Sequence, residues 1–249
     1  MNATIVSDLH VGSRYFLSQY FEPFLDTIPR DHEIILNGDI IDSPYDKLEP
    51  SQEGVLERIK QRSYHQEVVW VRGNHDNGYL PRDFGNVRFR PHHDIGDRLL
   101  IMHGDQFDEV MPRNRGFVKA FKMMHDVRVK LGAKPVHVAH YAKKWHMFYK
   151  VLRRNVMMNA VDCARANGYG AVTCGHTHYG EDRIFNGIRY INTGAWTECP
   201  AFYLTVTPKE MTLKAVSGSP DSMERAANGS HQRFPLALHL GPGTHDQGP

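Results

Sequence analysis

The chain has 249 residues, of which 41 % are hydrophobic and 23 % charged, and its 30 basic and 28 acidic side chains give a formal net charge of +2. These proportions are typical of a folded domain and exclude a collagen-like or wholly disordered chain. The sequence shows no apolar run long enough to cross a membrane, no secretory leader at its amino terminus and no CxxC pair among its three cysteines, so we expect a cytoplasmic protein with reduced thiols.

Four short apolar runs, each followed by a cluster of polar residues, dominate the first hundred positions. They are Ala3–Ser7, Glu33–Leu36, Val68–Val71 and Leu99–Met102, and the segment Pro50–His65 between them has apolar residues at helical spacing. This alternation predicts the strand, loop and helix units of an α/β domain. The polar clusters would then lie at the carboxyl ends of the strands, the edge at which open α/β sheets bind ligands.

From Phe107 to about Asn167 the pattern becomes helical, and Gly132 and Pro135 are predicted to divide it into at least two helices. The range Arg113–Arg165 holds 13 lysines and arginines against two aspartates, together with several methionines and aromatic residues. Such a basic and apolar segment favours contact with a phosphate ester, a nucleic acid or an anionic membrane, while a helical pair with one solvated face is the simpler alternative.

Four further apolar runs predict that strands return after the helical segment. They are Ala171–Cys174, Gly187–Asn192, Phe202–Val206 and Met211–Ala215. The final residues, Ser217–Pro249, are rich in glycine, serine, proline and histidine, and we expect them to form a weakly packed tail.

Five polar clusters follow the predicted strands in a fixed order. They are Asp8-Leu9-His10, Gly38-Asp39-Ile40-Ile41-Asp42, Gly73-Asn74-His75-Asp76, His103-Gly104-Asp105 and Gly175-His176-Thr177-His178. Short patterns such as DxH arise often by chance, whereas the four-residue GNHD match is roughly a 0.2 % accident in a chain of this length. The occurrence of all five clusters, each after an apolar run, is far less probable by chance and indicates one composite site.

These residue types indicate a pair of metal ions. Imidazole, carboxylate and amide oxygen without thiolate suit first-row cations such as manganese, iron or zinc. In an extended segment Asp8 and His10 would point the same way, as would His176 and His178, and Asp39 beside the flexible Gly38 is placed to bridge two ions. Two ions that share a hydroxide would supply a nucleophile at neutral pH without serine or cysteine.

The ordered clusters resemble the signature of the calcineurin-like metallophosphoesterase superfamily: DxH, GDxxD, GNHD or GNHE, an isolated histidine, and GHxH. The resemblance covers about Thr4 to Val216. It implies a four-layer α/β/β/α sandwich of two sheets flanked by helices. The implied organisation is a metallophosphoesterase domain over residues 1–216, with a helical insert at about 109–167 that acts as a lid, and a carboxyl-terminal tail over 217–249.

The resemblance also assigns roles to single residues. One metal would be held by Asp8, His10, Asp39 and His178, and the other by Asp39, Asn74, His103 and His176. His75 matches the histidine that stabilises the transition state and protonates the leaving oxygen, and Asp42 matches the carboxylate that orients it. A proton donor of near-neutral pKa beside a carboxylate suits the departure of an alkoxide.

A narrower similarity concerns three segments. MHGDQFD at Met102–Asp108, the helical insert before GHTH, and NTGAWTE at Asn192–Glu198 are similar to the UDP-2,3-diacylglucosamine hydrolase-like branch. That likeness implies that the insert covers a pocket for acyl chains, which its methionines and aromatic residues suit. The chain differs from the branch at His75, where the branch has arginine.

We therefore expect a dinuclear-metal phosphoesterase that hydrolyses a phosphodiester or pyrophosphate bond through a metal-bridging hydroxide, with a UDP-2,3-diacylglucosamine-like nucleotide-lipid as the candidate substrate. The alternatives are a phosphodiesterase or nuclease acting on soluble nucleotides or nucleic acid, a general phosphatase, and a scaffold that has lost catalysis. Two divalent cations are the expected cofactors, manganese first and iron or zinc as alternatives. The expected partners are a phosphate ester that can be lipid-linked and, through the basic insert, the periphery of the inner membrane.

Overall fold

The structure is a computed structural model that describes residues 1–79, 81–133, 143 and 145–216. The predicted tail at 217–249 and the helix break at Pro135 lie outside the described residues. The predicted strands and helices between these limits can be compared with the structure directly.

The first of two sheets has six strands in the order β11-β10-β1-β2-β3-β4. Its three central strands run parallel and consist almost entirely of buried residues, as expected for strands covered on both faces. The strands are β1 (Asn2–Val6), β2 (His32–Asn37), β3 (Val68–Val71), β4 (Arg88–Arg90), β10 (Phe202–Val206) and β11 (Met211–Ala215).

The second sheet has five strands in the order β5-β6-β7-β9-β8. Strands β6, β7 and β9 are parallel, and an antiparallel strand lies at each edge. The strands are β5 (His93–Ile95), β6 (Leu99–Ile101), β7 (Ala171–Cys174), β8 (Glu181–Phe185) and β9 (Ile188–Asn192). The helical insert connects β6 to its parallel neighbour β7, so it emerges from the strand ends of this sheet.

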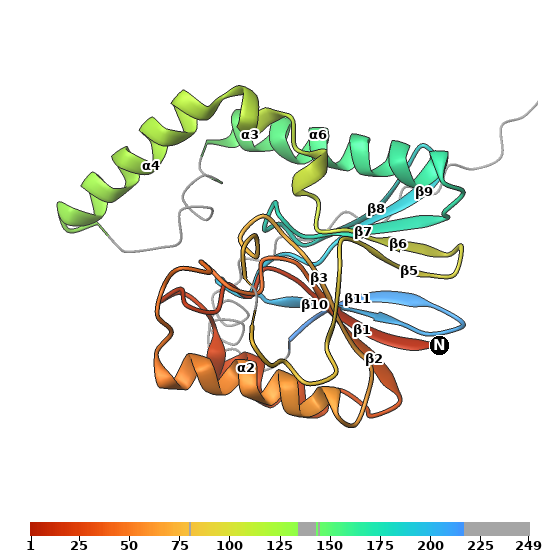
Figure 1. The fold of residues 1–249 in the computed structure, drawn as a ribbon. Coiled ribbons are helices and arrows are strands. Elements are labelled where there is room, and N and C mark those ends of the chain that lie inside the picture. Colours follow the sequence, from red (N-terminus) through yellow and green to blue (C-terminus); the bar gives the residue numbers. More distant parts are fainter. Residues whose placement is uncertain (80, 134–142, 144, 217–249) are drawn as a thin grey trace, which may run out of the picture.

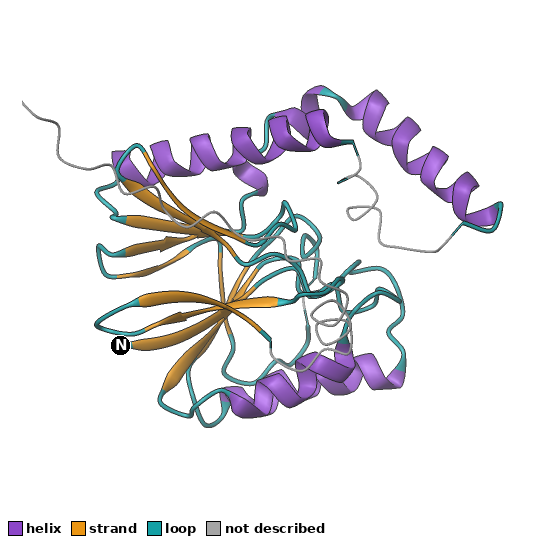
Figure 2. Ribbon diagram, turned by 180° about the vertical axis from the view of Figure 1, so that it is seen from behind, coloured by secondary structure: helices purple, strands orange, loops and turns teal. Residues whose placement is uncertain are grey.

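Helices lie against each sheet on the face turned away from the other sheet (Figures 1 and 2). Helices α1 (Ser18–Thr27) and α2 (Pro50–Ser63) share a hydrophobic core with the first sheet, in which Trp70 is fully buried. Helix α6 (His146–Ala166) packs on the second sheet, and a third core, which contains Ile5, joins the two sheets. The prediction of a mixed α/β fold built from two sheets and helices is confirmed.

The described helices of the insert that precede α6 extend away from the two sheets. Asp105–Phe107 forms a short 3-10 helix, η1, and is followed by α3 (Val110–Arg113) and α4 (Arg115–Lys130). Helix α4 projects away from both sheets (Figure 1). Among the described helices, none combines the length and the apolar character that a bilayer span requires.

Candidate metal centre

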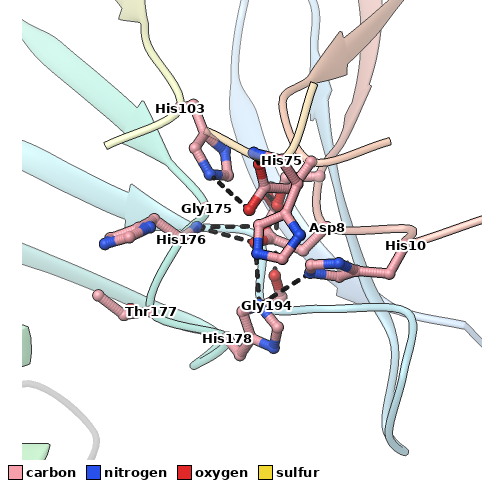
Figure 3. Close-up of polar contacts among 12 residues, drawn as sticks. Asp8, His10, His75, His103, Gly175, His176, Thr177, His178 and Gly194 are labelled. Carbon is pink, nitrogen blue, oxygen red and sulfur yellow. Dashed lines mark hydrogen bonds and ion pairs between the residues drawn. The ribbon is translucent and has the colours of Figure 1, made fainter. Parts of the chain in front are cut away.

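The polar clusters converge at the carboxyl ends of parallel strands from both sheets (Figure 3). Three groups of side chains have ligand atoms that all lie within 4.8 Å of one another. One of them is His10, Asp42 and His75, and the other two contain only residues predicted to bind metal. Of these two, the first group consists of Asp8, His10 and His178, and the second of Asp39, His103 and His176. Six of the seven residues predicted to bind metal are thus brought together from turns that follow β1, β2, β6 and β7.

The candidate ligands have an unusual backbone. Six non-glycine residues in the described chain have positive φ, and five of these are candidate ligands: Asp8, His10, Asp39, His176 and His178, with φ between 52° and 60°. This left-handed conformation costs an L-residue on the order of 1 kcal/mol and is concentrated at functional sites. The expectation that the Asp and His pairs converge because they are extended is wrong, since both pairs lie beyond their strands and converge through left-handed turns.

Distances in the first group suit a single cation. His10 Nε2 lies 3.1 Å from His178 Nε2, and His178 Nε2 lies 3.2 Å from Asp8 Oδ1. A divalent cation bound at about 2.1 Å places adjacent ligand atoms roughly 3 Å apart. His10 Nδ1 donates to the Asp42 carboxylate at 2.9 Å, which leaves His10 Nε2 as the lone-pair nitrogen that a metal needs.

The second group has the same arrangement. His103 Nε2 lies 3.1 Å from Asp39 Oδ2, and His103 Nδ1 donates to the carbonyl oxygen of Asn37 at 3.0 Å. His176 Nε2 lies 2.9 Å from Asp108 Oδ2, so its Nδ1 is the nitrogen left to bind a metal. Each of these two histidines is therefore fixed by one ring nitrogen and offers the other. The donor set fits a divalent cation, and Asp108 is a supporting residue that the sequence did not predict.

The two buried aspartates are held in their ionised form. Burial would raise the pKa of Asp39, but the neighbouring His103 outweighs it and holds the pKa well below its usual range. For Asp8 burial again acts upward, and the adjacent His178 and His103 lower the pKa below its ordinary value. Carboxylates that stay ionised at neutral pH can bind a cation without first losing a proton.

Asp76, the last residue of GNHD, supports the site from beneath. Its buried carboxylate accepts three consecutive backbone N–H groups beginning at Asp39, at 2.9 to 3.2 Å. It also accepts the N–H of Gly73 at 2.9 Å and the indole N–H of Trp70 at 3.1 Å. These bonds connect the turn that contains Asp39 with the turn that contains His75. This role of Asp76 was not predicted.

His75, Asp42 and Asn74 lie at the outer side of the site. The backbone N–H of His75 donates to Asp39 Oδ1 at 2.8 Å, and its Nδ1 donates to the carbonyl oxygen of Asp42 at 2.6 Å. The Asp42 carboxylate is nearer to His10, at 2.9 Å, than to His75, at 4.0 Å. The contact that orients His75 therefore comes from the Asp42 carbonyl. Asn74 is exposed on the same turn, and its role as a ligand stays a prediction.

A cavity of about 1090 Å³ adjoins the first group at His178. It lies between α6 and the loops that flank β8 and β9. Its charged lining consists of Lys143, Lys150, Arg153, Arg154, Arg183, Glu181 and Glu198. Positive charge predominates, and the two carboxylates are already engaged: Glu181 pairs with Arg153 and Arg183, and Glu198 with Lys143.

The sequence model of the calcineurin-like phosphoesterase family matches residues 1–180, a range that contains every candidate ligand. No curated protein matches the chain.

Similar solved structures include Yfce, a phosphoesterase from E. coli, with 15 % identity, 87 % of this chain and 94 % of that chain covered, and a TM-score of 0.47. An archaeal phosphodiesterase has 16 % identity, covers 86 % and 99 % of the two chains, and has a TM-score of 0.43. Vacuolar Protein Sorting 29 from Cryptosporidium parvum has 16 % identity, 86 % and 95 % coverage, and a TM-score of 0.42.

Proposed function

Because the chain belongs to the calcineurin-like phosphoesterase family, we propose that it is a metal-dependent hydrolase of phosphodiester or pyrophosphate bonds. The main support is the pair of His and Asp groups whose ligand atoms lie within 4.8 Å of one another at one edge of the two sheets. Such a mixed, thiolate-free donor set suits manganese, iron or zinc, and manganese is the metal we propose.

In this proposal two cations would be held, and Asp39 would be the residue common to both ligand sets. Asp8, His10 and His178 complete the first set, and Asn74, His103 and His176 complete the second. When bound, two such cations supply Lewis-acid stabilisation of the phosphate and a water acidic enough to act as a nucleophile at neutral pH. The carboxylates contribute ionised oxygens, and Asp42, Asn37 and Asp108 hold the imidazoles so that one nitrogen of each faces the site.

His75 is the residue proposed to donate a proton to the leaving oxygen. Its Nδ1 proton is used by the Asp42 carbonyl, so Nε2 is the nitrogen available to substrate. The ring lies 4.8 Å from the ring of His10, measured between centroids, and 38 % of the side chain is exposed. A substrate phosphate held beside His10 would therefore have the His75 imidazole within reach, which is the arrangement that general acid catalysis needs.

The cavity beside His178 favours a substrate larger than a phosphate monoester. Its volume of about 1090 Å³ is at the upper end of ordinary ligand pockets. Lys150 and Arg154 line it and form no ion pair within the described part of the chain. We propose that a second anionic group of the substrate lies there, as in a UDP-2,3-diacylglucosamine-like nucleotide-lipid. A soluble nucleotide or a nucleic acid strand is the alternative.

The helical insert is also proposed to touch an anionic lipid surface from the cytoplasmic side. Several apolar side chains of the insert are exposed. They are Met123 and Val127 in α4, Leu131 directly after it, and Met147 at the start of α6. Lysines and arginines are interspersed with these apolar side chains along the insert. Exposed apolar groups with adjacent cations are typical of helices that bind anionic membranes.

The test uses full-length protein, stripped with a chelator and reloaded with manganese, iron or zinc. We expect metal-dependent hydrolysis of bis(p-nitrophenyl) phosphate, and loss of nearly all of it in Asp39→Asn, which removes the shared carboxylate charge. Asp94→Asn, at an exposed position of β5, is the matched control and should keep full activity. Unchanged hydrolysis by Asp39→Asn would overturn the proposal. Binding of less than about one metal per chain would favour a scaffold without catalysis.

A further inference from the structure

The loop 176–178 carries two candidate ligands, and side chains from just before the helical insert and from around the beginning of α6 contact each of its three residues. Asp108, which precedes the insert, bonds the His176 ring at 2.9 Å. The hydroxyl of Tyr149 in α6 donates to the carbonyl oxygen of the second residue, Thr177. Lys143 Nζ, just before α6, donates to the carbonyl oxygen of the third residue at 2.6 Å.

These three side chains are themselves held in place. Asp108 Oδ1 accepts the N–H groups of Val110 and Met111, which ties it to the start of α3. Lys143 also pairs with Glu198, and Tyr149 is buried in the core between α6 and the second sheet. The contacts therefore connect the loop to the packed base of the insert and not to freely rotating surface groups.

The chain immediately after the loop is fixed by the same helix. The Arg153 guanidinium lies 3.3 Å from the centre of the Tyr179 ring and bonds Glu181 at 2.8 Å. Helix α6 thus contacts Thr177, Tyr179 and Glu181. Lys143, which lies just before the helix, contacts the carbonyl oxygen of His178.

The backbone of the loop needs such support. His176 and His178 have φ of 60° and 53°, a conformation that the chain adopts only where its surroundings enforce it. From the sheet side, the N–H of His176 donates to the Asp8 carboxylate at 3.0 Å. The carbonyl oxygens of Thr177 and His178 are bonded from the insert side. The loop is therefore held by hydrogen bonds from both sides.

We propose that Tyr149 and Lys143 are positioning residues, which hold the loop 176–178 in the conformation that directs its two histidines at the metal centre. The helical insert then builds part of the metal site in addition to lying beside it. This inference rests on the proposed function, because it assigns these residues a role in metal binding.

The experiment compares Tyr149→Phe and Lys143→Met with the unmodified full-length chain. Equilibrium dialysis with Mn²⁺ alone gives the dissociation constant, and hydrolysis of bis(p-nitrophenyl) phosphate over a series of Mn²⁺ concentrations gives kcat at saturation. We expect the dissociation constant to rise about tenfold or more, the effect usual for residues that orient metal ligands, and saturating Mn²⁺ to restore most of kcat. Because Mn²⁺ also stabilises the folded state of a merely destabilised protein, the rescue is compared with the thermal stability of the metal-free variants.

Asn159→Ala is the matched control on the same helix. Asn159 donates to the carbonyl oxygen of Phe107 at 2.8 Å, so its loss weakens the docking of α6 without touching the loop. Thermal unfolding of the metal-free proteins measures the general loss of stability in each variant. The control should keep the Mn²⁺ affinity of the unmodified chain.

Three results would overturn the inference. The first is an unchanged Mn²⁺ dissociation constant in Tyr149→Phe and Lys143→Met. The second is a loss of affinity that follows thermal stability equally in all three variants, which would make the contacts structural only. The third is that the unmodified chain binds no Mn²⁺, and this result alone would also overturn manganese as the metal of the proposed function.

Discussion

Three glycines, Gly38, Gly73 and Gly175, bring the backbone closer to candidate ligands than any other residue would permit. A Cβ atom on Gly175 would lie 2.1 Å from Asp8 Oδ2, and one on Gly38 would lie 2.4 Å from the His103 ring. Gly38 also has φ of +80°, whereas Gly175 has an ordinary φ. Substitution of Gly175 therefore tests the effect of close approach alone, because alanine can adopt the backbone conformation found there.

Gly175→Ala is expected to displace the Asp8 carboxylate, because real Cβ atoms do not approach an oxygen to 2.1 Å. We expect a Mn²⁺ affinity at least about tenfold lower and a loss of about 1–3 kcal/mol in the free energy of unfolding. Equilibrium dialysis and urea unfolding measure the two quantities. The control is Gly54→Ala in α2, where no atom lies within 4 Å and alanine should stabilise the helix by about 0.5–1 kcal/mol. Equal metal affinities in the two variants would contradict the expectation.

His75→Ala separates proton donation from metal binding. The contact of His75 with Asp39 uses the backbone N–H, which alanine retains, so the metal set should stay intact. We expect kcat to fall by roughly 10²–10⁴ because the imidazole is lost as general acid. The measurements are kcat at saturating metal and the number of metal ions per chain. A variant that lost its metal together with its activity would show that His75 supports the site and does not act on the substrate.

At the residue scale, the sequence predicted which side chains meet but not what holds them. The five motifs identified six residues that the structure brings together, because the order of strands places their ends at one edge. Asp76, Tyr149 and Lys143 were missed because they act on backbone N–H and carbonyl groups, which every residue has. A contact with the backbone leaves no partner residue type to search for in the sequence. The structure alone reveals it.

At the scale of elements, the two long helices of the insert differ in what they contact. Helix α6 buries Tyr149, Leu152, Val156 and Ala160, a stripe at spacings of three and four residues that packs on the second sheet. Helix α4 instead projects from the body and exposes apolar side chains. The proposed lipid contact is therefore expected to depend on α4, and substitutions there should leave the core intact.

The double substitution of Met123→Gln and Val127→Gln tests this element. The two side chains are 65 % and 50 % exposed and lie four residues apart on α4. We expect weaker sedimentation of the protein with vesicles that contain phosphatidylglycerol, and no change in the free energy of unfolding, because apolar groups adjacent to cations bind the anionic interface. Ile184→Gln, 75 % exposed on β8, is the control outside the insert. Equal vesicle binding by both variants would contradict a role for α4.

Two elements that were not predicted, α1 and β8, have sequences that either argue against their structure or give no signal for it. Helix α1 contains Pro23, which lacks an N–H group and argues against a helix, yet burial of Phe21, Phe24 and Leu25 outweighs that cost. Strand β8 contains mostly exposed and charged residues, so its pairing with β9 has no apolar signal. The buried parallel strands were predicted to within two residues because both of their faces are covered, which makes them apolar throughout.

At the scale of the molecule, the candidate ligands come from both sheets. Asp8, His10 and Asp39 follow strands of the first sheet, whereas the isolated His103 and the histidines of GHTH follow strands of the second. The first group joins the sheets through His178, and the second joins them through Asp39. Metal binding should therefore link the two halves of the protein at one edge, beside the apolar core between the sheets.

Removal of metal is accordingly expected to lower the stability of the whole fold. A ligand present at about 100 times its dissociation constant adds about 2.7 kcal/mol to the free energy of unfolding when it binds only the folded state. For a chain of this size that corresponds to a rise in Tm of roughly 5–10 °C. The measurement is thermal unfolding in a chelator and in excess Mn²⁺. Asp39→Asn, which lacks the carboxylate charge of the group formed with His103 and His176, should lose most of the shift, whereas Asp94→Asn should keep it. An equal shift in both variants would mean that Mn²⁺ stabilises the protein elsewhere, because a cation held beside His103 and His176 cannot bind as tightly without the Asp39 carboxylate that completes this group.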